Sequence, residues 1–275
     1  MKKILQNNNS TIVKADKSKG IIIIDRNTLG EKTDNFVQDN NIKQINKDPT
    51  DKYQRQIQQT IQRCNLLVDK QKYEYLTNIK PMAPKLIIYI KTHKDSEPVR
   101  PVINTTQAPS YKIAKHLNKK LYNLLCLPNT YNTKNSQEIA EELKRVQINE
   151  QMRIITLDIK DLYVNLPIPG IIRAAKFWLN KNISDKELIK QTLHMLQTIM
   201  KQNYFQYNDK FFQPEKGIAM GSPISSTMAE VYLQYIEETY VKQWLVSKEI
   251  IYYKRYVDDI IIIFDQNKTG RNNFT

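Results

Sequence analysis

The sequence has 275 residues, with 42 Lys or Arg against 28 Asp or Glu, which gives a formal net charge of +14. This length allows one or two compact units with a full core. The positive charge predicts an acidic partner, with nucleic acid the first choice and an anionic membrane the second. The two cysteines, Cys64 and Cys126, lack metal-binding spacing, and no apolar run is long enough to span a bilayer. We therefore expect an intracellular protein with reduced thiols, no zinc site and no membrane segment.

The N-terminal part of the chain is polar and predicts few elements. We divide the chain into an N-terminal segment, residues 1–79, and a core, residues 80–275. Residues 1–13 are rich in Asn and are expected to fray. Further along, Thr50 predicts the cap of a helix over residues 51–70, with its apolar residues near one face.

A basic turn over residues 14–20 leads into an apolar run over residues 21–26, which predicts a buried strand. Gly20 stands at the junction and is expected to act as the pivot. The turn carries three lysines, Lys14, Lys17 and Lys19. These lysines are either phosphate contacts or part of a solvated loop.

Residues 80–94 and 99–105 predict two strands of a basic hairpin. Lys85, Lys91 and Arg100 lie on it or beside it. Such a ribbon is suited to neutralise the charge of phosphate groups. Arg100 is the best single candidate, because a guanidinium group forks onto two phosphate oxygens and an ammonium group does not. The alternative is that these residues are ordinary surface cations.

A basic amphipathic helix is predicted over residues 109–125. Its apolar positions are Ile113, Leu117, Leu121 and Leu124, and its lysines, mostly opposite, are Lys112, Lys115, Lys119 and Lys120. A basic face of this kind suits a nucleic-acid backbone without base specificity. A second helix is predicted over residues 136–146.

The following segment alternates between apolar runs and breaks. A β-branched run over residues 153–158 ends in an acid, Asp158. Helices are predicted over residues 170–180 and 185–201. A hairpin over residues 204–213, turned at Asn208-Asp209, comes next.

A loop with two glycines precedes the last predicted helix. Gly217 and Gly221 are expected to let a base pair or a sugar approach the backbone closely. Ser222 predicts the N-cap and Pro223 the first helical position of a helix that runs to about Trp244. Taken alone, a Gly-Ser-Pro turn begins many ordinary helices.

Two adjacent acids, Asp258 and Asp259, stand between two apolar strands over residues 250–264. Neighbouring carboxylates repel each other, and Mg²⁺ with its oxygen ligands would relieve this repulsion. Asp158 ends a similar strand and is the expected third carboxylate. Two ions roughly 4 Å apart clamp the attacking and leaving oxygens of an in-line phosphoryl transfer. The alternative is that Asp158 caps a strand and that the acid pair forms a solvated turn.

The acid-ending strand, the glycine-serine-proline loop and the Tyr-x-Asp-Asp hairpin, in this order, resemble motifs A, B and C of reverse transcriptases. Four stretches more narrowly resemble the Penelope-like retroelement enzymes: residues 84–94, 98–103, 108–112 and 220–223. The resemblance extends from about residue 14 to about residue 265. It implies an α+β fold with the palm and fingers of a right-hand polymerase.

The resemblance also implies a mechanism, in which the 3′-hydroxyl of a DNA primer on an RNA template attacks the α-phosphate of a deoxynucleotide. Asp158, Asp258 and Asp259 would hold two Mg²⁺ ions, with Mn²⁺ as a possible substitute. The substrate-binding residues implied are Arg100, Lys85, Lys91, Tyr163, Gly221, Ser222 and Tyr256. No protein partner is indicated.

Tyr163 matches the family's aromatic residue that packs under the sugar of the incoming nucleotide. A ring there leaves no room for a 2′-hydroxyl. Tyr163 and Val257 therefore favour DNA synthesis over the RNA synthesis of viral polymerases. The alternative is that Tyr163 is simply a core aromatic residue.

The sequence departs from the family after the catalytic hairpin. The family continues with the rest of the palm and a helical thumb, and Penelope-like elements often carry a GIY-YIG endonuclease, which is not visible here. We therefore expect a fragment without its thumb, and the alternative function is an inactive remnant that only binds nucleic acid. The family resemblance makes the nucleus one location to consider, although no clear targeting signal is present.

Overall fold

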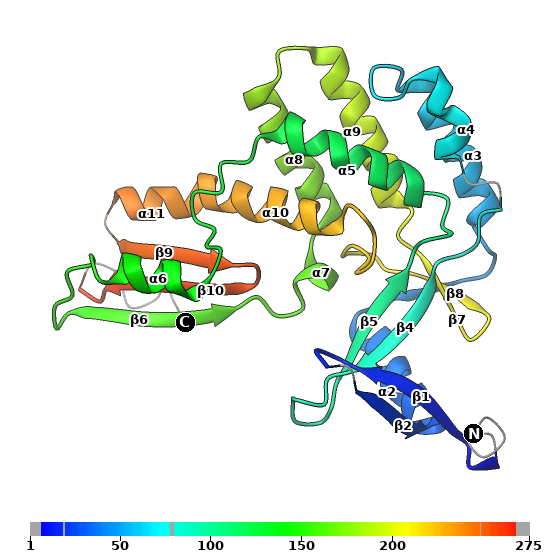
Figure 1. The fold of residues 1–275 in the computed structure, drawn as a ribbon, viewed down its shortest axis with the longest axis horizontal. Helices are drawn as coiled ribbons and strands as arrows, with labels where there is room; N and C mark the ends of the chain where they lie inside the picture. The colour runs from blue at the N-terminus through cyan, green and yellow to red at the C-terminus, as the bar shows by residue number, and fades with distance from the viewer. Residues whose placement is uncertain (1–6, 19, 78–79, 248, 268–275) are drawn as a thin grey trace.

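The computed structural model describes residues 7–18, 20–77, 80–247 and 249–267 (Figure 1). The strands are β1 (Ser10–Ala15), β2 (Ile21–Asp25), β3 (Lys43–Ile45), β4 (Lys85–Ile90), β5 (Val99–Asn104), β6 (Met152–Asp158), β7 (Phe205–Tyr207), β8 (Lys210–Gln213), β9 (Ile250–Tyr256) and β10 (Asp259–Asp265). The helices are α2 (Arg26–Asp39), α3 (Thr50–Arg63), α4 (Tyr73–Leu76), α5 (Tyr111–Leu125), α6 (Ser136–Leu143), α7 (Leu162–Asn165), α8 (Ile168–Asn182), α9 (Lys186–Lys201), α10 (Ser225–Ile236) and α11 (Lys242–Val246). A 3₁₀ turn, η1 (Lys70–Lys72), precedes α4, and a π-helical turn, η2 (Glu237–Val241), joins α10 to α11.

One sheet joins strands from the N-terminal segment to strands of the core. Its order is β2-β1-β4-β7-β8-β3, and β5 pairs with β4. β4 and β5 form the predicted antiparallel hairpin, and β1 runs parallel to β4. The turn between β7 and β8 has positive φ at Asn208 and Asp209, as its sequence predicted. β1 and β3, from the predicted N-terminal segment, lie in the same sheet as strands of the predicted core. The division of the chain after residue 79 stays a prediction.

β4 shows why this sheet has one buried face and one open face. Leu86, Ile88 and Ile90 are buried, whereas Ile87 is exposed and Tyr89 is half-buried. The buried residues pack with Ile103 and with apolar residues of α2. Arg100 lies directly opposite Tyr89 in the register, which places it on the open face.

A second sheet has the order β6-β10-β9. Val241 and Leu245 of the α10–α11 segment pack with Ile250, Tyr253 and Ile262 of this sheet. Figure 1 shows this helical segment running along the sheet. The helical segment therefore covers one face, and β6, an edge strand of this sheet, leaves Ile154 and Leu157 exposed, one on each face.

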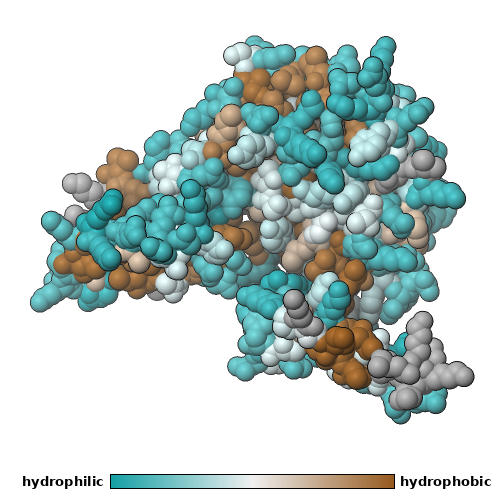
Figure 2. Space-filling model, viewed as in Figure 1, coloured by the Kyte–Doolittle hydropathy of each residue, from teal (hydrophilic) through white to brown (hydrophobic). Residues whose placement is uncertain are grey.

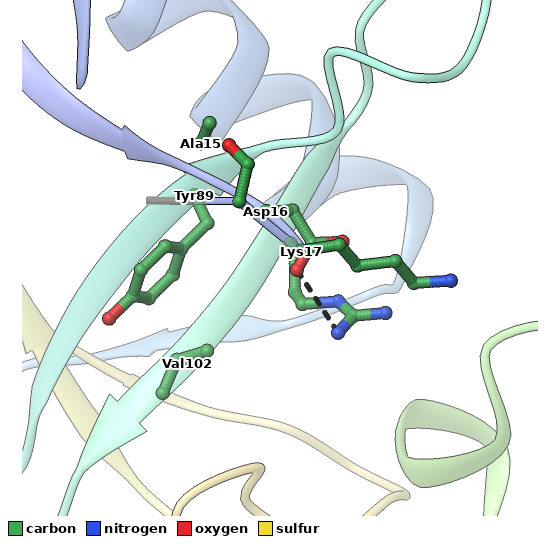
Figure 3. A pocket seen from close by; sticks show the side chains of 7 residues that line it. Ala15, Asp16, Lys17, Tyr89 and Val102 are labelled. Carbon is green, nitrogen blue, oxygen red and sulfur yellow. Dashed lines mark ion pairs between the residues drawn. The ribbon is translucent and has the colours of Figure 1, made fainter. Parts of the chain in front are cut away.

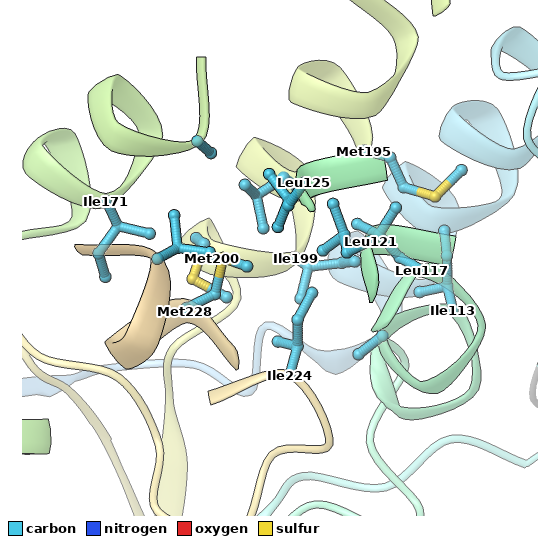
Figure 4. Packing of buried hydrophobic residues seen from close by; sticks show 14 of the residues in the cluster. Ile113, Leu117, Leu121, Leu125, Ile171, Met195, Ile199, Met200, Ile224 and Met228 are labelled. Carbon is cyan, nitrogen blue, oxygen red and sulfur yellow. The ribbon is translucent and has the colours of Figure 1, made fainter. Parts of the chain in front are cut away.

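A helical core lies between the two sheets and is built from α3, α5, α8, α9 and α10. The predicted apolar face of α5 is confirmed, since Ile113, Leu117 and Leu121 are completely buried (Figure 4). Trp178 of α8 is also buried, and its ring N–H donates a hydrogen bond to the carbonyl of Val231, 3.2 Å away. In the part of the chain that the structure describes, no helix combines the length and apolar character needed to cross a membrane.

The N-terminal expectations need two corrections. Ser10–Ala15 forms a strand where fraying was expected, because its backbone pairs with both β2 and β4. The strand over Ile21–Asp25 forms as predicted but is not buried: Ile21 and Ile23 are 71% and 67% exposed, because β2 is an edge strand with one face covered. Figure 2 shows the resulting hydrophobic patch at the lower edge of the molecule.

The helix expected over residues 51–70 is shorter than predicted. It begins at Thr50, with Pro49 in the capping position, and ends at Arg63. The Thr50 hydroxyl does not cap the helix; it lies 2.8 Å from the hydroxyl of Tyr204. Local propensity suggested a cap, but a buried contact with a residue far along the chain decides the role of Thr50.

Candidate active site

The turn between β9 and β10 presents the two adjacent acids. Val257 and Asp258 form the turn, and Tyr256 faces Asp259 in the register. Val257 has a φ of +56°. This left-handed conformation is an outlier for a β-branched residue and shows that the surrounding structure holds the turn.

Asp158 meets this turn from the neighbouring strand. It lies directly opposite Asp259 in the antiparallel register of β6 and β10, so both side chains lie on the same face. The Ile159 N–H donates to the Asp258 carbonyl, 3.0 Å away, which ties the end of β6 to the turn. The structure therefore brings the three predicted acids to one end of one sheet. Like charges placed opposite each other are destabilising, and a cation would offset this.

The donor set at this end suits a hard divalent cation, because carboxylate oxygens are the ligands that Mg²⁺ and Mn²⁺ prefer. Within the described residues, no three His, Cys, Asp or Glu side chains are grouped so that they hold a metal ion. The fit therefore rests on the type of ligand and on the strand register. The role of Asp158, Asp258 and Asp259 as metal ligands stays a prediction.

A buried arginine supports the turn from behind. The Arg255 side chain is 1% exposed, and its Nη1 donates to the Val257 carbonyl, 2.9 Å away. Its Nε donates to Glu237 at 2.6 Å, and its two Nη atoms donate to the two carboxylate oxygens of Glu230 at 3.0 Å each. Asn132 accepts a further bond of 2.6 Å from Nη2. These residues, which we call the Arg255 network, connect α10, η2 and a distant loop to the turn between β9 and β10.

Within the Arg255 network, the positive charge of Arg255 is compensated by direct ion pairs with Glu230 and Glu237. Burial raises the pKa of Glu237. Burial also favours the neutral form of Glu230, but the hydrogen bonds from Arg255 outweigh it and hold the pKa of Glu230 below its usual range. Sequence reasoning missed this network. Its signal is a pair of basic residues, Lys254 and Arg255, in an otherwise apolar and aromatic strand, with three acids on the helical segment before it.

Tyr163 lies in the short helix α7, between Asp158 and the helical core. The Ile218 N–H donates to its backbone carbonyl, 2.8 Å away. Burial raises the pKa of the half-buried Tyr163, and the carboxylates of Glu230 and Asp258 raise it further. The phenol is therefore coupled electrostatically to Asp258 of the turn, and its role as a sugar contact stays a prediction.

The glycine loop makes room for protein backbone. A Cβ at Gly221, whose φ is +115°, would lie 2.2 Å from the carbonyl oxygen of Ile103. At Gly217, with φ +83°, it would lie 2.5 Å from the carbonyl oxygen of Val164. The Ile103 N–H also donates to the Met220 carbonyl, 2.7 Å away. The glycines let the loop join β5 to the segment that carries Tyr163, and the close approach of a base pair or a sugar stays a prediction.

The expected start of the following helix is wrong by two residues. α10 begins at Ser225, and Ile224 occupies the capping position. The Ser222 carbonyl accepts from the Ser225 N–H at 3.3 Å, and the Ser225 hydroxyl donates to the Ala219 carbonyl at 2.8 Å. Ser222 thus belongs to the loop, because the loop's contacts with β5 delay the helix.

We expect Gly221→Ala to lower the free energy of unfolding by about 2 kcal/mol or more, because the new methyl group meets backbone in a left-handed conformation. Gly30→Ala is the matched control, since a Cβ at Gly30 in α2 meets nothing within 4 Å. That control should stabilise the protein by up to about 1 kcal/mol. Urea unfolding measures both, and an unchanged Gly221→Ala variant would contradict the packing role.

The basic residues of the hairpin differ in their surroundings. Arg100 forms an ion pair with Asp16, Nη1 to Oδ1 3.1 Å, and lines a hollow of about 470 Å³ (Figure 3). Lys85 is exposed at the start of β4, and Lys91 is half-buried just beyond its end. Arg100 therefore has the most defined position of the predicted phosphate contacts.

The remaining candidates lie in less enclosed places. Tyr256 is 51% exposed beside the turn acids. Lys14 and Lys17 are exposed on the first hairpin, and Lys19 lies outside the described residues. Figure 2 shows the surface hollowed between the arm that holds the turn acids and the lower lobe that holds the basic hairpin.

The two sheets, the helical core and the acid turn form the palm and fingers of a right-hand polymerase, as predicted. A family model described as reverse transcriptase (RNA-dependent DNA polymerase) matches residues 90–274. The chain belongs to this family.

Solved telomerase structures are similar in fold. The telomerase from Candida albicans in complex with a TWJ fragment of telomeric RNA has a TM-score of 0.61 at 12% identity, over 94% of this chain and 46% of that one. The apo telomerase from Candida tropicalis has a TM-score of 0.59 at 10% identity, over 95% and 48%. A form of it truncated from the C-terminal domain gives 0.61 at 11%, over 94% and 53%.

The chain thus spans about half the length of these structures, and at such identities the likeness shows the fold alone. No curated protein matches the sequence.

Proposed function

We propose that this chain is the RNA-directed DNA polymerase of a retrotransposable element and extends a DNA primer on an RNA template. The observation that carries the proposal is the strand register, in which Asp158 lies opposite Asp259. A backbone hydrogen bond from the residue after Asp158 also joins the end of β6 to Asp258. Membership of the reverse transcriptase family supports the proposal. The sequence of residues 220–223, Met-Gly-Ser-Pro, supports a Penelope-like element.

In this proposal the carboxylates of Asp158, Asp258 and Asp259 hold two divalent ions, Mg²⁺ or Mn²⁺. When bound, such ions make the primer hydroxyl more acidic and stabilise the leaving pyrophosphate. Arg100, with Lys85 and Lys91, binds the triphosphate of the deoxynucleotide and neutralises its charge. Ser222, Gly221 and Tyr256 contact the template or the nucleotide, and Tyr163 lies under the sugar.

The alternative function is nucleic-acid binding without catalysis. The net charge of +14 supports it, as do the exposed lysines of α5, Lys115 and Lys119. Primer extension on an RNA template with deoxynucleotides and Mg²⁺ separates the two functions. Extension that stops when the metal is chelated supports the polymerase, whereas salt-sensitive binding of the duplex without extension supports the remnant.

We expect Tyr163→Ala to relax the choice of sugar, because removing the ring leaves space for a 2′-hydroxyl. The preference for deoxynucleotides over ribonucleotides should fall by at least about tenfold, a typical effect of opening a steric pocket. Competition between the two nucleotide types measures this preference. Tyr240→Ala, at an exposed position on η2, is the control. If Tyr163→Ala excludes ribonucleotides as well as the wild type does, Tyr163 does not select the sugar.

A further inference from the structure

A buried carboxylate lies beneath the best-placed cation of the fingers. Asp16, in the turn after β1, is 8% exposed, and its backbone N–H donates to the Ile90 carbonyl of β4 at 2.8 Å. Its Oδ1 holds Nη1 of Arg100 from β5 at 3.1 Å. Three strands thus fix one ion pair, and Asp16 approaches Arg100 from the side of the first hairpin.

Stability alone does not account for this pair. Burying a carboxylate has a large desolvation cost, which a single partner repays only with good geometry and further hydrogen bonds. The other oxygen, Oδ2, is also buried and has no hydrogen-bond partner in the described part of the chain. An apolar residue would fill this place at a lower cost. Unlike an apolar residue, a carboxylate can orient a guanidinium group.

The orientation matters because Arg100 faces open space. Its side chain is 39% exposed, and one edge of its fork is engaged by Asp16. A guanidinium group has five N–H donors in a rigid plane, so fixing one edge aims the others. Arg100 itself lines the hollow of about 470 Å³, together with Tyr89 and Val102. This volume suits a phosphate chain of nucleotide size.

A second cation comes from the same turn. Lys17 follows Asp16 and adopts a left-handed conformation with φ of +59°. The turn is closed by the Ala15 N–H, which donates to the Gly20 carbonyl at 3.0 Å. Figure 3 shows the long side chain of Lys17 extending on the side where the ion pair lies. The Asp16 contact therefore also links Arg100 to the turn that carries Lys17.

We propose that Asp16 is a positioning residue: it fixes Arg100 toward the triphosphate of the incoming nucleotide and joins Arg100 to the turn of Lys17. The proposal rests on the proposed polymerase function and extends it to a residue that makes no contact with the substrate. A preoriented guanidinium group loses less entropy when the triphosphate binds, so affinity is gained without a new contact.

The test is a double-mutant cycle of Asp16→Asn and Arg100→Ala in steady-state primer extension. Asn keeps the shape of the side chain and removes its charge. We expect Asp16→Asn to raise the KM for deoxynucleotide by about tenfold and to leave kcat within about twofold, a coupling typical of contacting residues. In the Arg100→Ala background it should have no further effect, because its only route to the nucleotide is then gone.

Asp69→Asn is the matched control, since Asp69 also pairs with a cation, Lys72 at 2.8 Å, but lies far along the chain in an exposed pair. It should leave KM unchanged. Equal effects of Asp16→Asn with and without Arg100 would overturn the proposal, and so would an unchanged KM in an active enzyme.

Binding of inorganic tripolyphosphate separates this inference from the proposed function, because it needs no catalysis. A wild type that binds tripolyphosphate but extends no primer would overturn the polymerase function; weaker binding by Asp16→Asn would still support the positioning role. Extension by the wild type, with equal tripolyphosphate binding by both proteins, would overturn the positioning role and leave the polymerase function standing.

Discussion

Asp258→Ala should abolish nucleotide incorporation, with a loss of at least about 10³-fold in rate, since charge stabilisation by a bound metal amounts to several kcal/mol and each 1.36 kcal/mol is tenfold. Asp258 lies in the turn between β9 and β10. The next residue, Asp259, lies opposite Asp158. Removal of the Asp258 side chain takes away one of three metal-holding carboxylates and leaves the strands paired. Single-turnover primer extension measures the rate.

The control for this change is Asp34→Ala, which removes an exposed acid from α2. It alters the net charge by the same amount and should keep the wild-type rate. Both variants should bind a primer–template duplex at least as tightly as the wild type, because each makes the protein more positive. An Asp258→Ala variant that incorporates nucleotides at the wild-type rate would contradict the metal assignment.

Arg255→Met should have the largest effect on stability. The change leaves the buried Glu237 and the half-buried Glu230 without their cation. Breaking a buried ion pair by removing one partner costs about 3–5 kcal/mol, because the remaining charge is buried and uncompensated. The Val257 carbonyl loses its Nη1 donor as well. The free energy of unfolding, measured in urea, should fall by this amount.

Arg153→Met is the matched control. Arg153 is an exposed residue of β6, and its guanidinium group donates to the nearby backbone carbonyls of Glu150 and Met152. Its replacement should change the free energy of unfolding by no more than about 0.5 kcal/mol, as for surface positions in general. Equal stabilities of the two variants would show that the Arg255 network does not hold the fold together.

Much of the fold follows from local pattern. The runs of β-branched residues that became β4, β6, β9 and β10 predicted strands, and the apolar stripe on residues 109–125 predicted α5. The acids of the turn stood out because adjacent carboxylates are unfavourable in an apolar hairpin. Their meeting with Asp158 was predicted from chemistry, and the strand register supplies the geometry.

The failures share a physical cause, which is contact between segments distant in sequence. Nothing local to Ser222 shows that its loop is bound to β5 and that the helix therefore begins at Ser225. Ser10–Ala15 contains three β-branched residues, Thr11 to Val13, within a polar and Asn-rich surrounding, and its pairing with strands on both sides makes it a strand. The sequence shows Asp16 only as an acid in a basic turn, and its ion pair with the distant Arg100 becomes evident in the structure.

Metal-directed cleavage tests whether divalent ions are held where β6 meets the β9–β10 turn. Fe²⁺ takes the place of Mg²⁺ in oxygen-ligand sites. Bound Fe²⁺ reduces added hydrogen peroxide to hydroxide and a hydroxyl radical that cuts the nearest backbone, and ascorbate returns the resulting Fe³⁺ to Fe²⁺. We predict cuts beside Asp158 and Asp258 that excess Mg²⁺ suppresses and that Asp258→Ala abolishes. Cuts elsewhere in the chain, or cuts insensitive to Mg²⁺ and to the substitution, would contradict the account.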